Sequence, residues 1–213
     1  MKGCVALCFL AGLFAQAGVA GPLSVRNGNI CILGSSGEVK ELTSSGNDSQ
    51  PDLSPDKRSV VFVRTLPGKT IPTGAGDSAA TELWRVEASG KNATRLVAPK
   101  SADKTEQILA GFSKPQFSAD GHSIFFIGDA WATDGAIHVF DTTTGKEHFV
   151  CPGSDLEVVK TGEYRNCLLV QQHRYFIGGG TYDWYWLLRS TGKEIGPVGE
   201  GTENFKATYA PEQ

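Results

Sequence analysis

The sequence predicts an all-β fold, a small β-propeller-like array of about four blades, and three observations lead to this prediction. A polar segment that runs into an apolar strand occurs twice, at residues 50–63 and 114–127. Four further apolar runs each lead into a Gly-centred turn, and these glycines lie 53, 55 and 47 residues apart, close to the length of one blade. Only residues 102–110 have helical character. A repeated strand–turn–strand unit of this size indicates sheets arranged radially or in a stack.

The first half of each clear unit has three recognisable parts. Pro51 and Pro115 precede the first strand, where no ladder donor is needed. A Ser-x-Asp segment follows at residues 54–56 and 118–120, and predicts a polar turn held by hydrogen bonds from side chains to the backbone. The next run is apolar at nearly every position, as expected of a strand that is covered on both faces.

The second half of each unit is a hairpin closed by glycine, which adopts positive φ without a Cβ clash. The first unit has only this second half, at residues 25–43, and residues 205–211 resemble the missing first half. We therefore expect the N- and C-terminal strands to pair in one blade, which would close the ring and cover its strand edges. An open four-unit arc and a dimer that completes a larger ring are the alternatives.

The first twenty residues have the pattern of a signal peptide. Lys2 gives the positive start, residues 5–14 are apolar, and the small residues before Gly21 predict cleavage after Ala20. The mature chain, residues 21–213, would then be a single propeller domain in the periplasm or secreted. The apolar stretch is shorter than the roughly 20 residues that a spanning helix needs. No later segment is a candidate, so we expect no transmembrane segment after signal removal.

Charge and cysteine content limit the possible partners and cross-links. The formal net charge is −3 with scattered lysines and arginines, and without a basic stripe we expect no nucleic-acid partner. After signal removal Cys31, Cys151 and Cys167 remain, an odd number that allows one internal disulfide. Cys151 and Cys167 are the candidate pair, and three buried thiols are the alternative.

The clear units resemble a known repeat family. Residues 51–64, with 83–90 and 94–96, resemble the WD-like β-propeller repeat of the TolB family, and residues 114–150 resemble a second copy. The units at 29–43 and 155–198 are degenerate, so the resemblance covers about half of the chain. It implies a periplasmic propeller with partners in the cell envelope. TolB has six blades and an additional N-terminal domain, whereas this sequence has about four units.

No catalytic or metal site can be assigned from residue patterns. His138 and His148 flank one hairpin, but no further ligand has the spacing that zinc needs, so we expect neither a metal nor a cofactor. The Gly-x-Ser-x-Gly elbow of α/β-hydrolases does not occur in the sequence. The sequence favours a protein that is not an enzyme. A propeller-based hydrolase or lyase would instead need titratable residues from several blades to converge in the central channel.

Two loops between the second and third strands of a unit are candidate binding elements. Residues 65–81, which include Lys69, form a long polar segment that we expect to be a flexible loop. Its counterpart at residues 128–135 carries Trp131 and Asp134. Because both loops connect equivalent strands, they should emerge on the same rim. A calcium loop was the alternative for the second segment, but the regular ligand spacing is missing.

The richest cluster of aromatic residues lies around three successive glycines, in residues 175–186. Tyr182 and Asp183 follow these glycines and are candidate binding residues, because aromatic side chains at loop tips are frequent anchors. Trp184 and Trp186 are more typical of packing between blades. The sequence therefore predicts a non-catalytic module that uses loops on one face to bind an envelope protein, peptide or glycan. A partial propeller without activity of its own is a further alternative.

Overall fold

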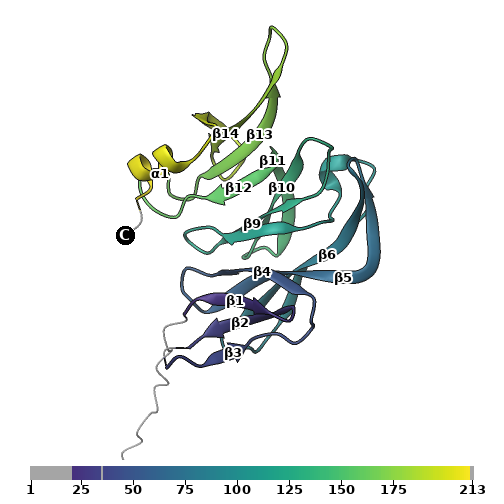
Figure 1. The fold of residues 1–213 in the computed structure, drawn as a ribbon, viewed down its shortest axis with the longest axis vertical. Helices are drawn as coiled ribbons and strands as arrows, with labels where there is room; N and C mark the ends of the chain where they lie inside the picture. The colour runs from purple at the N-terminus through teal and green to yellow at the C-terminus, as the bar shows by residue number, and fades with distance from the viewer. Residues whose placement is uncertain (1–20, 35, 212–213) are drawn as a thin grey trace, which may run out of the picture.

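The computed structural model describes residues 21–34 and 36–211, so the expected signal peptide lies outside the described residues. Four antiparallel sheets follow one another along the chain and are stacked from the N-terminal to the C-terminal end (Figure 1). In every sheet the spatial order of the strands is their order in the sequence. Each sheet is thus one repeat of the chain, and the predicted all-β array of four blades is confirmed.

We number the sheets 1 to 4 in chain order. Sheet 1 contains β1 (Leu23–Arg26), β2 (Asn29–Leu33) and β3 (Val39–Glu41). Sheet 2 contains β4 (Asp48–Leu53), β5 (Ser59–Thr73), β6 (Gly76–Glu87) and β7 (Thr94–Val97). Sheet 3 contains β8 (Ser113–Phe117), β9 (Ser123–Gly128), β10 (Gly135–Asp141) and β11 (Lys146–Gly153). Sheet 4 contains β12 (Asp155–Val158), β13 (Leu168–Tyr175), β14 (Thr181–Leu188) and β15 (Glu194–Gly199). The helices are η1, a 3₁₀ turn (Thr105–Gln107), and α1 (Glu203–Tyr209).

The hydrophobic core lies between neighbouring sheets. Val60 and Phe62 of β5 pack in the cluster between sheets 1 and 2, whereas Val61 and Val63 pack in the cluster between sheets 2 and 3. A third cluster, which includes Phe125, fills the space between sheets 3 and 4. Because successive side chains of a strand point to opposite faces, a continuous apolar run covers both faces at once.

The Ser-x-Asp turns have the predicted side-chain hydrogen bonds. The Ser118 hydroxyl donates to the Asp120 carboxylate at 2.6 Å, and the His122 N–H donates to the same carboxylate at 3.0 Å. The Ser123 N–H donates to the Ser118 hydroxyl at 3.0 Å. The turn at residues 54–59 repeats this arrangement with distances of 2.6, 3.0 and 2.9 Å.

This turn predicts a pH-dependent contribution to stability. The Ser118 hydroxyl, and next the His122 N–H, lower the pKa of Asp120 in the folded protein. The stabilisation is therefore present above the unfolded pKa of about 3.9 and is lost as the pH falls through the folded pKa. We expect Asp120→Asn to cost about 0.5–1 kcal/mol near neutral pH, and less at pH values below both pKa values. Urea unfolding across this pH range measures the difference, and a constant difference would contradict the prediction.

The predicted closure of the ring by the C-terminal segment is wrong. Residues 203–209 form helix α1 instead of a strand. Phe205 and Tyr209, four residues apart, lie on one face of the helix, and their rings lie 5.6 and 5.5 Å from that of Tyr164. Helix α1 lies beside β12, at the opposite end of the stack from sheet 1 (Figure 1). The described chain is therefore an open arc, and its first sheet has three strands.

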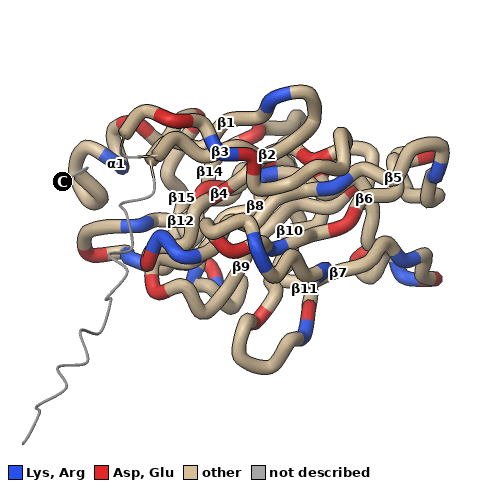
Figure 2. Tube along the Cα trace, turned by 90° about the horizontal axis from the view of Figure 1, so that it is seen from below, with Lys and Arg blue, Asp and Glu red and all other residues tan. Residues whose placement is uncertain are grey.

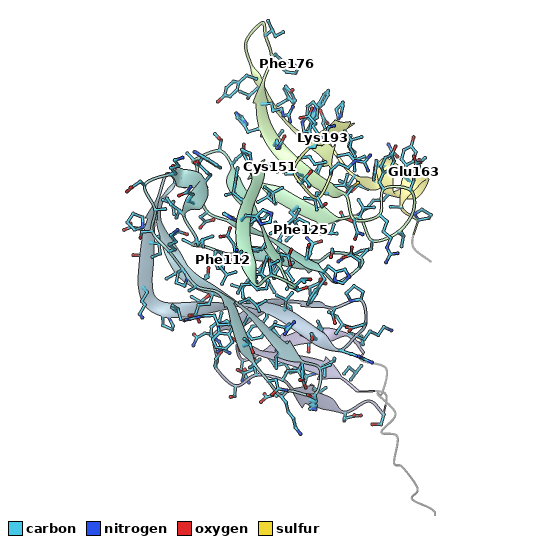
Figure 3. The ribbon with its side chains drawn as sticks, turned by 180° about the vertical axis from the view of Figure 1, so that it is seen from behind. Phe112, Phe125, Cys151, Glu163, Phe176 and Lys193 are labelled. Atoms are coloured by element: carbon cyan, nitrogen blue, oxygen red, sulfur yellow. The ribbon has the colours of Figure 1, made fainter. Side chains whose placement is uncertain are left out.

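The expected disulfide between Cys151 and Cys167 does not form in this structure. Cys151 lies in the cluster between sheets 3 and 4, and its place in the interior is visible in Figure 3. Cys167 packs on the opposite face of sheet 4, so that the sheet separates the two residues. Cys31, Cys151 and Cys167 are all buried free thiols. Burial raises the pKa of Cys151 to about 12 and also raises that of Cys167, which makes both poor nucleophiles.

Candidate functional site on the loop rim

The connections between equivalent strands define one rim of the array. In a meander, the link from the second to the third strand of each four-stranded sheet leaves on the same side. These links join β5 to β6, β9 to β10 and β13 to β14. We use the name loop rim for residues 64–81, 128–135 and 172–184.

Residues 65–81 form a hairpin arm, which corrects the expectation of a flexible loop. The ladder between β5 and β6 continues from Thr65↔Thr81, through a bulge, to Thr73↔Gly76. Its β-branched residues favour a strand in spite of the interspersed Gly and Pro. Lys69 lies exposed in the bulge, between the paired residues Thr65 and Thr70.

The tip of this arm lies against the loop at residues 128–135. A Cβ at Gly74 would come within 2.7 Å of the Ala130 carbonyl oxygen, so the two backbones approach closely. The Ser78 hydroxyl donates to the Asp129 carboxylate, and the Phe112 N–H donates to the Thr81 hydroxyl at 2.6 Å. The two loops that the sequence assigns to one rim thus contact each other.

The loop at residues 128–135 places both of its candidate residues against neighbouring elements. The Trp131 N–H donates to the Asp134 carbonyl at 2.9 Å, and the Trp131 ring makes an edge contact with Phe149. Asp134 Oδ1 accepts a hydrogen bond from the His173 N–H at 3.3 Å. Burial raises the pKa of Asp134 and the nearby Asp183 charge adds to this effect, while the His173 N–H opposes it.

A second arm, formed by β13 and β14, projects beyond the rest of the molecule (Figure 1). Its tip carries three consecutive apolar residues that pack little against the body. Tyr175 is 71% exposed, Phe176 is 52% exposed, and Ile177 is as exposed as in an extended chain. Figure 3 shows Phe176 at this outer end of the molecule.

The shaft of this arm is held by contacts between aromatic rings and by a cation–π contact. The ring of Tyr182 lies between those of Phe176 and Trp184 in tilted contacts, with ring centroids 4.5 and 5.1 Å away. The guanidinium of Arg174 lies 3.6 Å from the centroid of Trp186. These contacts support the arm up to Phe176, and they leave Tyr175 and Ile177 as the most exposed residues of the tip.

The structure brings some of the predicted site residues together and separates others. Asp134 accepts from the backbone of His173, and the His173 ring contacts Asp183 with 2.8 Å between Nδ1 and Oδ1. Trp131 lies beside the tip of the first arm. Lys69 forms no ion pair or hydrogen bond within residues 21–34 and 36–211, and remains isolated on its bulge.

Sequence reasoning missed the residues that are most exposed on the rim. The sequence pattern places Tyr175 and Phe176 in an aromatic cluster and predicts no role for Ile177. The signal was present, because three consecutive apolar residues directly precede three glycines. A strand with one covered face would alternate apolar and polar side chains. The role of His173 as a bridge between two loops could not be found, because it depends on the packing of sheets 3 and 4.

Comparison with known proteins identifies the fold. No family model and no curated protein matches the sequence. Among solved structures, one described as TolB from Agrobacterium tumefaciens superimposes with a TM-score of 0.53 and 14% identity, over 83% of this chain and 60% of that one. The propeller domain of the Trilobed protease from Pyrococcus furiosus gives 0.52 and 16%, over 82% and 51%.

The chain has a TolB-like β-propeller fold. A gluconolactonase from Xanthomonas campestris superimposes with a TM-score of 0.50 and 12% identity, over 81% of this chain and 56% of that one. This TolB-like propeller spans about half to three fifths of the length of these proteins. The neighbours include both enzymes and a TolB protein, so the likeness establishes the fold and leaves the function to be argued from the site.

Two titratable residues of this TolB-like propeller, Asp52 on β4 and Lys160 just after β12, lie close together. Lys160 Nζ lies 3.8 Å from the Asp52 carboxylate, and it donates to the Phe117 carbonyl. Burial raises the pKa of Asp52 and lowers that of Lys160. Asp52 also accepts from the Phe117 N–H at 2.8 Å. Both side chains are thus engaged in bonds that join neighbouring sheets, which is the arrangement of a structural link.

The histidines that suggested a metal site point apart. His138 pairs with Phe149 across the hairpin and His148 pairs with Val139, so the two histidines lie on opposite faces of sheet 3. Within residues 21–34 and 36–211, no group of three His, Cys, Asp or Glu residues is placed to hold a metal ion.

No helix in the described part of the chain is long and apolar enough to cross a membrane. Positive and negative residues are interspersed along the described trace (Figure 2).

Proposed function

We propose that this chain is a non-catalytic binding module of the periplasm or the secreted space, active as residues 21–213 after removal of a signal peptide. In this proposal the loop rim binds an envelope protein. The observation that carries the proposal is the exposure of Tyr175, Phe176 and Ile177 at the tip of the second arm. Exposure of apolar side chains to water is unfavourable in free energy. Their burial in a pocket of a partner is favourable and stabilises the complex.

Polar and charged residues of the loop rim lie near this apolar tip. Asp134, His173 and Asp183 lie at the base of the arm, where they can hydrogen-bond to a partner that contacts both loops. An apolar centre with a polar rim is the usual anatomy of a protein interface. A glycan would need aromatic faces along a groove, whereas the rings of Tyr182 and Trp184 contact each other at an interplanar angle of 59°.

The proposal is tested by substitution of the arm tip. The double variant Phe176→Ser/Ile177→Ser should weaken binding to an isolated envelope partner by about 10–100-fold, because anchor residues carry most of the binding energy. Partners are isolated from native envelope extract on the tagged mature protein, and affinity is measured by calorimetry. Val39→Ser, at a residue that is 40% exposed on β3, is the matched control and should bind like the wild type.

Equal affinity of the double variant and the wild type would contradict the proposed role of the arm. Because the tip makes few packing contacts, the double variant should be as stable as the wild type, and thermal unfolding checks this. Binding that is lost equally in the Val39→Ser control would assign the partner to another face.

A further inference from the structure

The first strands of sheets 2, 3 and 4 (β4, β8 and β12) repeat one set of contacts between sheets. The Phe117 N–H donates to Asp52 Oδ2 at 2.8 Å, and the Val158 N–H donates to Gln116 Oε1 at 3.0 Å. Asp52 and Gln116 occupy equivalent positions of β4 and β8, directly before Leu53 and Phe117. In both cases, an acceptor side chain on the first strand of one sheet binds a backbone N–H on the first strand of the next sheet.

At the C-terminal end of the array this series is completed by a helix. Glu157 of β12 occupies the same position as Asp52 and Gln116. Its carboxylate contacts Lys206 Nζ of α1 at 3.2 Å. Helix α1 packs on sheet 4 through Phe205 and Ala210, on the face that a following sheet would cover.

At the N-terminal end, the part of the chain that the structure describes contains no corresponding first strand. Sheet 1 consists of β1, β2 and β3, and the glycine turn after β2 corresponds to the turn after β6, the third strand of sheet 2. Strand β1 also packs beside β4, as β5 packs beside β8. Strands β1 to β3 are thus the second, third and fourth strands of a blade.

Two residues of β4 are less covered than their equivalents. Phe117 and Val158 are only 3% and 2% exposed, whereas Leu53 at the same position of β4 is partly exposed. Pro51 is likewise partly exposed, whereas Pro115 is buried. Within the described residues, no side chain of sheet 1 accepts the Leu53 N–H as Asp52 and Gln116 accept the equivalent groups.

Part of the backbone of β1 faces the place that a first strand of sheet 1 would occupy. The two-residue turn at Asn27 and Gly28 has φ values of 51° and 71° and closes the pair Arg26↔Asn29. In such a hairpin the closing pair and alternate pairs beyond it are hydrogen-bonded, so Arg26 and Ser24 bond to β2. Leu23 and Val25 then direct their N–H and C=O groups away from β2. Val25 is 44% exposed.

We propose that an extended segment of a partner polypeptide adds to β1 as the missing first strand of sheet 1. It pairs antiparallel with β1 through the outward backbone groups of Leu23 and Val25, which is recognition by strand addition. A carboxylate or carboxamide side chain of this segment accepts the Leu53 N–H, as Asp52 and Gln116 accept in the next two sheets.

Residues 21–34 and 36–211 do not offer this strand themselves. Strands β4, β8 and β12 are each paired within their own sheets, and residues 203–209 are helical at the other end of the array. The described residues of a second copy have the same strand pairing and the same helix, so they do not offer a free first strand either. This favours a different polypeptide as the source of the added strand. This binding edge is independent of the loop rim, so either proposal can fail alone.

The experiment uses a labelled peptide with the sequence of residues 48–54, which is itself a first strand of this protein. It should bind the mature protein saturably, and a peptide with alanine in place of the residue equivalent to Asp52 should bind about 10-fold more weakly, as the loss of a charge-assisted hydrogen bond requires. Val25→Pro removes the outward N–H and should weaken binding at least ~10-fold. Val25→Thr keeps the N–H and should bind within about 2-fold of the wild type.

Hydrogen exchange of the wild-type protein gives a readout that does not depend on a variant. The peptide should slow exchange at the amides of Leu23 and Val25 and leave the arm at residues 175–181 unchanged. Equal affinity of Val25→Pro and wild type, or no saturable binding below about 1 mM, would overturn the proposal. A dimer of the mature protein that the peptide dissociates would also overturn it, by assigning the edge to a second copy.

Discussion

Replacement of Phe125 by alanine should lower the free energy of unfolding by about 3–5 kcal/mol. Phe125 is fully buried in the cluster that joins sheets 3 and 4, together with Ile137 and Leu168. Loss of the ring removes its transfer free energy and leaves a cavity between two sheets that cannot both move inward. Since domains are stable by about 5–15 kcal/mol, much of the stability would be lost.

Urea unfolding followed by tryptophan fluorescence measures this effect. The matched control is Phe176→Ala, because the same ring is 52% exposed at the tip of the second arm. Because its ring contacts only Tyr182 in an aromatic pair within the described residues, this control should change the free energy of unfolding by no more than about 1 kcal/mol. Figure 3 shows the two phenylalanines in these contrasting places. Similar losses in both variants would contradict the packing of sheets 3 and 4 through Phe125.

Replacement of Arg64 by methionine should be almost as costly, at about 3–5 kcal/mol. The guanidinium donates to both carboxylate oxygens of Asp48, at 2.6 and 3.0 Å, and the Asp48 side chain is completely buried. The same guanidinium lies 4.4 Å from the ring centroid of Trp84. Without its partner, the Asp48 carboxylate would be a buried charge with no compensating cation.

The double variant Asp48→Asn/Arg64→Met separates the charge from the packing. Removal of both charges should recover a large part of the stability that the single variant loses, because no unpaired carboxylate remains. Thermal unfolding of the wild type, the two single variants and the double variant gives the coupling free energy between the residues. Strictly additive losses would show that the ion pair does not cause the effect.

The parts of the fold that could be predicted are those fixed by local interactions. The turn at Ser118 and Asp120 forms through hydrogen bonds within five residues, so its pattern is visible in the sequence. The hairpin glycines Gly90 and Gly145 have φ values of 77° and 68°, as their turns require. Such signals recur once in each unit, and their spacing gave the number of sheets.

The wrong predictions concern segments whose structure depends on distant contacts. Phe205 and Tyr209 fit either a strand or a helix, and their contact with Tyr164 selects the helix. The Gly- and Pro-containing segment at residues 65–81 becomes a hairpin arm that is held at its tip by the loop at residue 130.

The candidate site was predictable only in part, for the same reason. Tyr182 and Asp183 could be selected from local composition, because they follow three glycines. The contact of Asp183 with His173, which in turn binds Asp134, could not be predicted, because it requires sheets 3 and 4 to be packed together. The exposure of Ile177 likewise follows from how far the second arm extends beyond the body.

Helix α1 has a consequence for stoichiometry. Because it covers the outer face of sheet 4 and its Lys206 contacts Glu157, a further sheet cannot stack on this face as sheets 2 to 4 stack on one another. A head-to-tail interface that does not close produces open-ended filaments, and such growth needs two complementary ends on every subunit. The described part of this molecule has one end of that kind, so complexes formed by the proposed strand addition to β1 should stop at a one-to-one ratio.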